Sequence, residues 1–293
     1  MSERTRTLAQ LLGYPDDARV LIINADDFGM CHAENAATMS ALEQGAVCSS
    51  TIMVPCPWSA EAFAFARRNP AADIGVHITH TSEWDSLTWG PVLGRAAVPS
   101  LVDRRGALHQ AVGPFYAHAR LDEVEAETRA QIERALAAGI DVTHLDSHMG
   151  TVQLEPRYHA LYVRLAAEYR VPIRAVGRDG LHNMGMHDIV ELADQLGVLM
   201  PDHFCYGGPP TPGETAAYWT QLLRNLRPGV SELYIHAALD HPEMRAIGPC
   251  WEQRAADHAF FTAPTTRQLL RDLGITLIGY RPIRELQRRL RAC

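Results

Sequence analysis

Apolar and polar positions recur along the chain in a regular order, with a short strand-like run followed by a longer helix-like run. Residues 19–25 contain the apolar run VLII, which is typical of a buried strand, and 32–44 follow with helical spacing that ends at Gly45. Runs of the same strand-like kind predict further strands at 46–54, 73–79, 141–146, 171–175, 231–237 and 275–279. Helical periodicity predicts further helices at 58–69, 121–138, 156–169, 186–196, 213–226, 265–273 and 282–291.

This alternation predicts the α/β class, because parallel strands need crossover helices that return the chain to the same end of the sheet. We expect a single TIM-like β/α barrel of seven or eight strands over residues 19–293, after an N-terminal extension at 1–18. A doubly wound open sheet is the alternative. Two segments, 80–120 and 200–214, break the rhythm, and we expect the first to form a lid or wall over a functional site.

Composition excludes several classes of partner. The formal net charge is −7, and no basic cluster is longer than a pair, which argues against binding to nucleic acid or to an anionic membrane surface. No apolar run approaches the ~20 residues that span a bilayer, and the polar N-terminus lacks the apolar core of a signal peptide. The six cysteines form no CxxC pair and suit buried thiols in a reducing compartment. We therefore expect a cytoplasmic protein.

The stretch NADDFGM, residues 24–30, places two acids directly after the first predicted strand. Ionised carboxylates near a core are costly unless they are paired, hydrogen-bonded or bound to a metal. Because adjacent residues of a strand point to opposite sides, we expect Asp26 and Asp27 to have different roles rather than to form a matched acid–base pair. A turn in which an aspartate caps the next helix is the simpler alternative.

Histidines and a further acid follow two other predicted strands. His77 ends the third, and the motif THLDSH places His144, Asp146 and His148 at the end of the fourth. Residues just past the carboxyl ends of barrel strands converge on one face. One carboxylate and two histidines from three strands therefore predict a site for a divalent ion such as Zn²⁺, with open coordination positions. For any one of these histidines alone, a structural role is the alternative.

Five motifs occur together in an order that resembles one known family. LIINADDFGM, SSTIMVP, DIGVHIT, THLDSH and GITLIGYR span roughly residues 19–285 and resemble the YdjC/ChbG-like carbohydrate deacetylase family. The combination of NADDFG, GVH and HLDSH is the specific part of this match. The resemblance implies a distorted β/α barrel related to the polysaccharide deacetylases. It also implies metal-dependent removal of an N-acetyl group from an amino sugar such as a chitooligosaccharide.

The roles of individual residues follow from the same resemblance. Asp27, His77 and His148 are similar to the family's ligands for one divalent ion, Zn²⁺ or Mg²⁺, and Asp26 is similar to its catalytic base. His236, in the motif LYIHA, resembles the late histidine that assists the tetrahedral intermediate. The implied partner is a small saccharide, and a homodimer is left open.

The chain departs from the family pattern beside these residues. His148 is followed by Met149, where many members carry further histidines, and Ala237 follows His236 in place of a common proline. His80 also stands where an apolar residue is usual. These differences concern the shape and polarity of the substrate pocket rather than the hydrolytic core.

Several polar and aromatic residues have two interpretations each. Asp146 either orients a metal-bound histidine or makes a strand-end hydrogen bond, and Arg174 either pairs with an acid, which we favour, or contacts substrate. Four aromatic residues either stack on sugar rings or anchor loops: Trp84, Trp89, Tyr206 and Trp251. Histidines without supporting motifs are interpreted as surface or structural residues: His80, His109, His118, His159 and His258.

Two other classes of function remain open on the same barrel. One is a metal-dependent hydrolase of another amide or ester bond, although the clustered basic residues that a phosphate group would favour are missing near the motifs. The other is a non-catalytic carbohydrate-binding protein, which would not need the acid pair and the histidines together.

Overall fold

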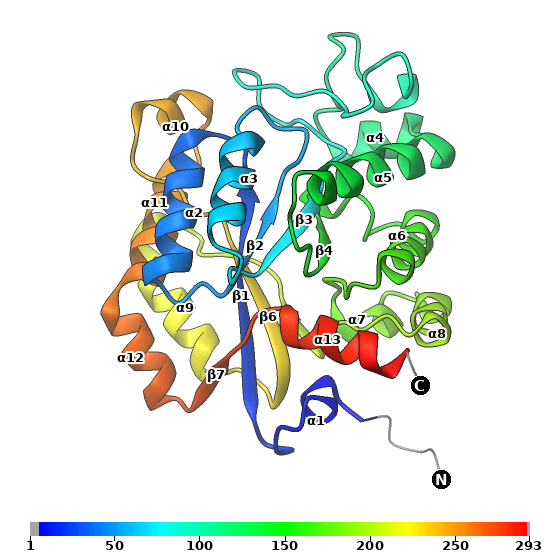
Figure 1. Ribbon diagram of the computed structural model, residues 1–293. Coiled ribbons are helices and arrows are strands. Elements are labelled where there is room, and N and C mark those ends of the chain that lie inside the picture. The colour runs from blue at the N-terminus through cyan, green and yellow to red at the C-terminus, as the bar shows by residue number, and fades with distance from the viewer. Residues whose placement is uncertain (1–5, 292–293) are drawn as a thin grey trace.

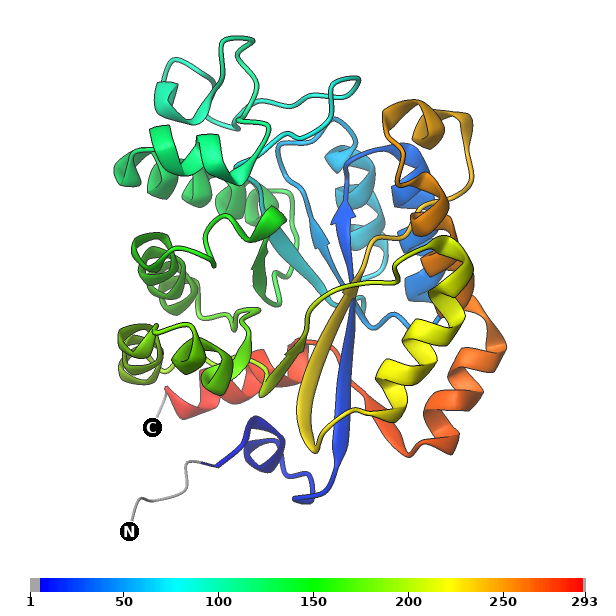
Figure 2. The same cartoon turned by 180° about the vertical axis from the view of Figure 1, so that it is seen from behind.

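The strand β1, Arg19–Phe28, is the centre of a parallel sheet. The computed structural model describes residues 6–291, and the sheet runs through its middle with helices on both sides (Figures 1 and 2). The other six strands are β2 Ser49–Ile52, β3 Ile74–Ile78, β4 Leu145–Ser147, β5 His203–Cys205, β6 Gly229–Ile235 and β7 Ile275–Leu277. They follow the order β4-β3-β2-β1-β6-β5. One edge of β1 pairs with β6, and the other is shared by β7 near its start and β2 near its end.

Every predicted helix has a counterpart within two residues at each end. These are α2 His32–Gln44, α3 Ser59–Arg68, α5 Leu121–Ala137, α6 Pro156–Tyr169, α8 His187–Leu196, α9 Thr215–Arg224, α12 Pro264–Asp272 and α13 Arg281–Leu290. The sequence prediction missed α1 Leu8–Leu11, α4 Val112–His118, α7 Gly177–Asn183, α10 Pro242–Ile247 and α11 Trp251–Thr262. Of these, α11 is the longest, and two of its three buried residues, Arg254 and Asp257, are charged, while the third is Phe261.

β1 is apolar because both of its faces are covered by other elements. Leu21 and Ile23 belong to a core cluster with side chains of α2, α9 and α12. Val20 and Ile22 point the other way and pack with residues of α1 and α13. A strand buried on both faces has a continuous apolar run instead of an alternating pattern, so the run predicted the strand correctly.

The ladders show the parallel strands of the expected barrel but not its full closure. Within residues 6–291 the strand ladders end at β4 and β5, and no ladder joins these two edges. The predicted strand at 171–175 lies beside β4, where it makes a single bridge between Ile173 and Leu145. Pro172 has no N–H to donate to a ladder, and the Ile173 N–H donates instead to the Leu199 carbonyl. The fold is therefore a parallel α/β sheet curled into an incompletely closed barrel.

The described part of the N-terminal extension packs on the amino ends of the strands. Leu8 of α1 is buried with Val20 and Ile22 of β1, and its N–H donates to Asp202 Oδ1 at 2.7 Å. Residues 1–5 of the predicted extension, and 292–293 at the other end of the predicted domain, lie outside the described residues. No helix within 6–291 has the length and apolar character needed to cross a membrane.

The insertion at 80–120 stands beside the carboxyl end of β3 and carries α4 (Figure 1). It is anchored by apolar side chains, with Leu101, Leu108 and Phe115 fully buried in the largest core cluster. It therefore forms an ordered wall above α5. Among its described residues, Glu83 is the one that lines a cavity at the carboxyl ends of the strands.

Candidate active site

A bulge at the end of β1 directs both aspartates of the NADDFGM motif into one cavity. The pairing of β1 with β2 shifts register between Ala25 and Phe28, and Asp27 adopts a left-handed backbone with φ of +62°. A bulge breaks the alternation of side chains, so the expectation that Asp26 and Asp27 point to opposite sides is wrong. A non-glycine residue in this conformation is uncommon, and such strain is often found at functional sites.

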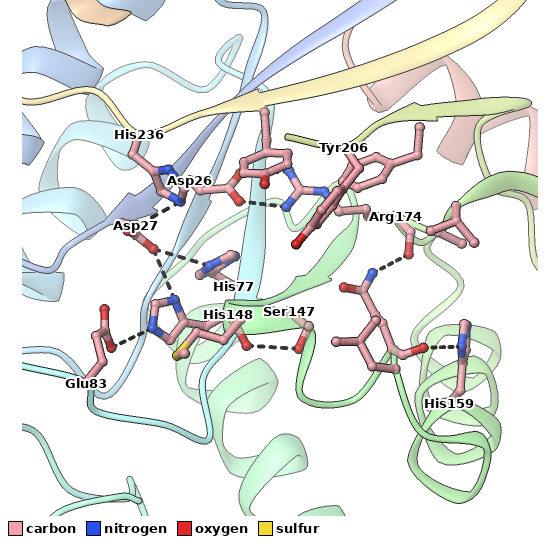
Figure 3. A pocket seen from close by; sticks show the side chains of 18 of the residues that line it. Asp26, Asp27, His77, Glu83, Ser147, His148, His159, Arg174, Tyr206 and His236 are labelled. Atoms are coloured by element: carbon pink, nitrogen blue, oxygen red, sulfur yellow. Dashed lines mark hydrogen bonds and ion pairs between the residues drawn. The ribbon is translucent and has the colours of Figure 1, made fainter. Parts of the chain in front are cut away.

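The cavity has a volume of about 420 Å³ and lies at the carboxyl ends of the strands. All five residues predicted from the sequence as site residues line it: Asp26, Asp27, His77, His148 and His236 (Figure 3). They come from β1, β3, the turn after β4 and the end of β6. The strands thus bring together residues that are up to 210 positions apart in the chain, from 26 to 236.

Asp27, His77 and His148 form a compact group of potential metal ligands. Asp27 Oδ1 lies 3.4 Å from His77 Nε2 and 3.2 Å from His148 Nδ1. One ligand atom from each residue lies within 4.8 Å of the others, and all three residues are buried. Among the described residues, no hydrogen bond reaches Asp27 Oδ1. A buried, unpartnered carboxylate oxygen between two imidazoles fits a divalent ion well.

The second nitrogen of each histidine is held by another carboxylate. His77 Nδ1 lies 2.7 Å from Asp146 Oδ1, and His148 Nε2 lies 2.8 Å from Glu83 Oε2 (Figure 3). Burial disfavours the charged form of His77, but Asp146 and Asp27 raise its pKa to about 9. Carboxylates behind metal-binding histidines commonly fix the ring and its tautomer. Asp146 thus has the contact required for an orienting role, while Glu83 was not considered from the sequence.

Asp26 is paired with Arg174, which was the favoured interpretation of that arginine. Both contacts, Arg174 Nη1 to Asp26 Oδ2 and Arg174 Nη2 to Asp26 Oδ1, are 2.7 Å long. Burial alone would raise the pKa of Asp26, but the guanidinium of Arg174 lowers it to about 2. Arg174 also reaches Asp146 Oδ2 at 3.0 Å and Glu232 Oε1 at 2.8 Å. Asp26 is therefore ionised and fixed in place at neutral pH.

The second oxygen of Asp27 faces Arg254 and His236. Arg254 Nη1 lies 2.9 Å from Asp27 Oδ2 and also contacts Glu34, while His236 Nε2 lies 3.8 Å from the same Asp27 oxygen. Burial would raise the pKa of Asp27, but His236 and Arg254 hold it well below its usual range. Burial lowers the pKa of His236, although the nearby charge of Asp27 acts in the opposite direction. Neither Arg254 nor Glu34 was predicted, because neither belongs to a recognisable motif.

Three of the four aromatic candidates anchor loops. Trp89 is 3% exposed and its Nε1–H donates to the Thr81 carbonyl, Trp84 packs against Gly248, and Trp251 lies under the guanidinium of Arg245. Of the four, Tyr206 alone lines the cavity, with 83% of its surface exposed. Sugar stacking therefore remains an interpretation for Tyr206.

Two of the histidines that were interpreted as surface or structural residues are His80 and His159. His80 is fully buried, with Nε2 2.8 Å from Thr128 Oγ1, in keeping with a structural residue. His159 is also buried but lines the cavity, as do the exposed Leu154 and Met184. Met149, which follows His148, lines the cavity as well and is 42% exposed. The cavity lining thus includes exposed apolar side chains as well as the acids and histidines.

Comparison with known proteins identifies the family. Residues 20–272 match the family model described as YdjC-like protein. The chain is 33% identical to a carbohydrate deacetylase of Thermus thermophilus, over 91% of this chain and 94% of that one. It is 30% identical to a chitooligosaccharide deacetylase of Yersinia enterocolitica, over 89% of this chain and 98% of that one.

A solved structure has the same overall arrangement. The crystal structure of a putative cellobiose-phosphate cleavage protein from Enterococcus faecalis superposes with a TM-score of 0.77 at 28% identity. The match covers 91% of this chain and 99% of that one. The match over residues 20–272 shows that the chain belongs to the YdjC-like protein family.

Proposed function

We propose that this protein is a metal-dependent hydrolase that removes the N-acetyl group from an amino sugar in a chitooligosaccharide or a related N-acetylglucosamine-containing saccharide. The observation that carries the proposal is the convergence of Asp27, His77 and His148 around one unpartnered carboxylate oxygen, with Asp26 in the same cavity. The names of the relatives, carbohydrate deacetylase and chitooligosaccharide deacetylase, support the substrate class.

The proposed ligands of a single divalent ion, Zn²⁺ or Mg²⁺, are Asp27, His77 and His148. Such an ion would act as a Lewis acid that polarises the acetamide carbonyl and lowers the pKa of water, so that water can lose a proton and attack near neutral pH. Asp146 and Glu83 would hold the two histidines in the orientation that leaves one ring nitrogen of each free to bind the ion.

Asp26 is the proposed general base. Arg174 keeps its carboxylate ionised, so a lone pair is available to accept a proton from the attacking water. The low pKa makes Asp26 a weak base, which favours rapid transfer of that proton onward. His236 lies on the other side of Asp27 and is partly open to the cavity. We assign to it the transfer to the amine, as the C–N bond breaks, of the proton that Asp26 accepted, with acetate as the second product.

The direct test is an assay for acetate release from N-acetylglucosamine and its short β-linked oligomers, with and without a chelator. We expect release that stops in chelator and returns when Zn²⁺ or Mg²⁺ is added back. Turnover of a different amide or ester, but of no N-acetyl sugar, would favour the alternative hydrolase. Saccharide binding without turnover in metal-loaded protein would favour a carbohydrate-binding protein.

A cytoplasmic location and a small saccharide as the physiological partner belong to the same proposal. Their support is the charge and the cysteine pattern of the sequence, together with the cavity dimensions.

A further inference from the structure

Two buried arginines line the cavity, and they differ in how many of their nitrogens are in use. All three nitrogens of Arg174 contact carboxylates: Nε contacts Glu232, and Nη1 and Nη2 contact Asp26. Each nitrogen of Arg174 thus already has a carboxylate partner. Its role is to hold the charges of the site together.

Arg254 is arranged differently. Its Nε donates to Cys250 Sγ at 3.2 Å, and its Nη1 contacts both Asp27 Oδ2 and Glu34 Oε1. Within residues 6–291, no hydrogen bond uses Nη2, although Arg254 lines the cavity. Arg254 Nη2 is not one of the buried side-chain atoms of these residues that lack a hydrogen-bond partner, so this nitrogen is not fully enclosed by protein. Two N–H groups of a fixed guanidinium are therefore available beside Asp27.

The surroundings of Arg254 keep it charged and immobile. Its Nη1 contacts the carboxylates of Asp27 and Glu34, and a guanidinium keeps its charge in proteins. Its guanidinium also lies 6.0 Å from the ring centroid of Trp84. A buried donor that is already oriented stabilises developing negative charge far more effectively than the same group in water.

We propose that Arg254 is a catalytic residue that donates Nη2–H to the acyl oxygen of the substrate as that oxygen becomes negative. The proposal rests on the proposed deacetylation. When the oxygen of water bonds to the carbonyl carbon, Asp26 takes the proton and the carbonyl π pair moves onto the acyl oxygen, where Arg254 donates. When the C–N bond breaks, the pair on the acyl oxygen re-forms the carbonyl and the C–N pair goes to nitrogen, which receives through His236 the proton that Asp26 accepted. The same donor then faces the carboxylate of the acetate product.

The rival explanation is that Arg254 only positions Asp27, through the 2.9 Å contact of Nη1. The two explanations predict different losses in Arg254→Gln. Loss of an oxyanion donor lowers kcat by about 10²–10³-fold with a small change in KM, and bound metal stays at one ion per chain. Loss of positioning alone weakens metal binding, and excess metal then restores the rate.

The experiment compares Arg254→Gln, Arg254→Lys and Arg254→Ala with the matched control Arg245→Gln, which removes an exposed arginine paired with Asp240. We expect a lower kcat with retained metal in Arg254→Gln, partial activity in Arg254→Lys, and partial rescue of Arg254→Ala by added guanidinium. The control should keep the wild-type kcat. Full recovery of Arg254→Gln in excess metal, or a kcat within threefold of wild type, would overturn the proposal.

Acetate binding provides a test that does not depend on turnover. In calorimetric titrations of metal-loaded protein with sodium acetate, we expect Arg254→Gln to bind at least about tenfold more weakly than wild type, because a charged hydrogen bond is lost. Equal affinities would count against Arg254 as the donor. If wild type releases no acetate from N-acetyl sugars, the proposed function fails, and the titration still decides whether Arg254 binds a carboxylate.

Discussion

The two oxygens of the Asp27 carboxylate face different kinds of neighbour. Its Oδ1 faces the ring nitrogens of His77 and His148, and its Oδ2 faces Arg254 and His236. The left-handed backbone at Asp27 makes this possible, because it turns the side chain into the cavity next to that of Asp26. At the residue scale, the site therefore depends on one unusual conformation in a strand that is otherwise regular.

The carboxylates behind the two histidines give the first prediction. Asp146→Asn and Glu83→Gln each keep the shape of the side chain but remove the charge that fixes a histidine ring. We expect each change to weaken binding of the divalent ion by roughly 10–100-fold, as changes to such supporting groups typically do. Metal titration by calorimetry measures the effect, with Glu125→Gln on the outer part of α5 as the control. Unchanged metal affinity in both variants would mean that the two contacts are structural only.

Residues with recognisable chemistry at strand ends were predictable, and their supporting residues were not. An acid of NADDFGM, His77 and the histidines of THLDSH could be grouped from the sequence because parallel strands end at the same face, and the family resemblance selected Asp27 and His148. Glu83 comes from a long insertion, and Arg254 comes from a helix whose buried face is charged. No periodicity indicates that such residues reach the cavity, since their approach depends on how distant elements pack.

At the scale of elements, α11 shows how a polar buried face is maintained. Asp257 of α11 is 5% exposed and accepts a hydrogen bond of 2.8 Å from Trp219 Nε1 of α9. Burial raises its pKa from 3.8 to about 6, although Trp219, Gln253 and Arg254 favour the charged form. The prediction of helices from apolar stripes missed α11 because this face is stabilised by hydrogen bonds between side chains.

The raised pKa of Asp257 predicts a dependence of stability on pH. Between about pH 4 and 6 the folded protein keeps a proton on Asp257 that the unfolded chain releases, so this residue's contribution to stability falls as pH rises. Asp257→Asn removes the ionisation and keeps an acceptor for Trp219. Two pKa units correspond to on the order of 3 kcal/mol, so the variant should be more stable than wild type at pH 7.5.

Thermal unfolding measured from pH 4 to pH 7.5 checks this expectation. The stability gap between Asp257→Asn and wild type should open as pH rises through 4–6 and then stay constant. The exposed Asp272→Asn should show no such gap. A variant that is less stable than wild type at pH 7.5 would mean that the negative charge of Asp257 is needed by its neighbours.

At the scale of the whole molecule, the candidate site and the apolar cluster of α1 and α13 lie at opposite ends of the strands. The cavity occupies the carboxyl ends of the strands, while α1 and α13 cover the amino-terminal side of β1 with an apolar cluster (Figure 2). The alternation of elements predicted the class and the helices. Closure was harder to predict, because it depends on whether short edge segments such as 171–175 form a ladder or only a single bridge.

This separation predicts that stability can be changed without changing the site. Leu8 of α1 is 4% exposed, and Leu8→Ala should lower the free energy of unfolding by about 2–4 kcal/mol, as is usual for a buried leucine. Metal affinity at the other end of the strands should stay within twofold of wild type. Chemical denaturation and metal titration measure the two quantities. A parallel loss of metal affinity would show that the two ends are coupled.

The central claim is that the two aspartates of NADDFGM have different tasks, with Asp27 as a ligand of the divalent ion and Asp26 as the base. The most direct measurement is acetate release and bound metal in Asp26→Asn and Asp27→Asn over a range of metal concentrations. Asp26→Asn should bind metal almost normally and lose at least roughly 10²-fold in turnover at every concentration, because a general base contributes about 10²–10⁴-fold. Asp27→Asn should bind metal weakly and regain part of its activity in excess metal. The same response to added metal in both variants would contradict the division of roles.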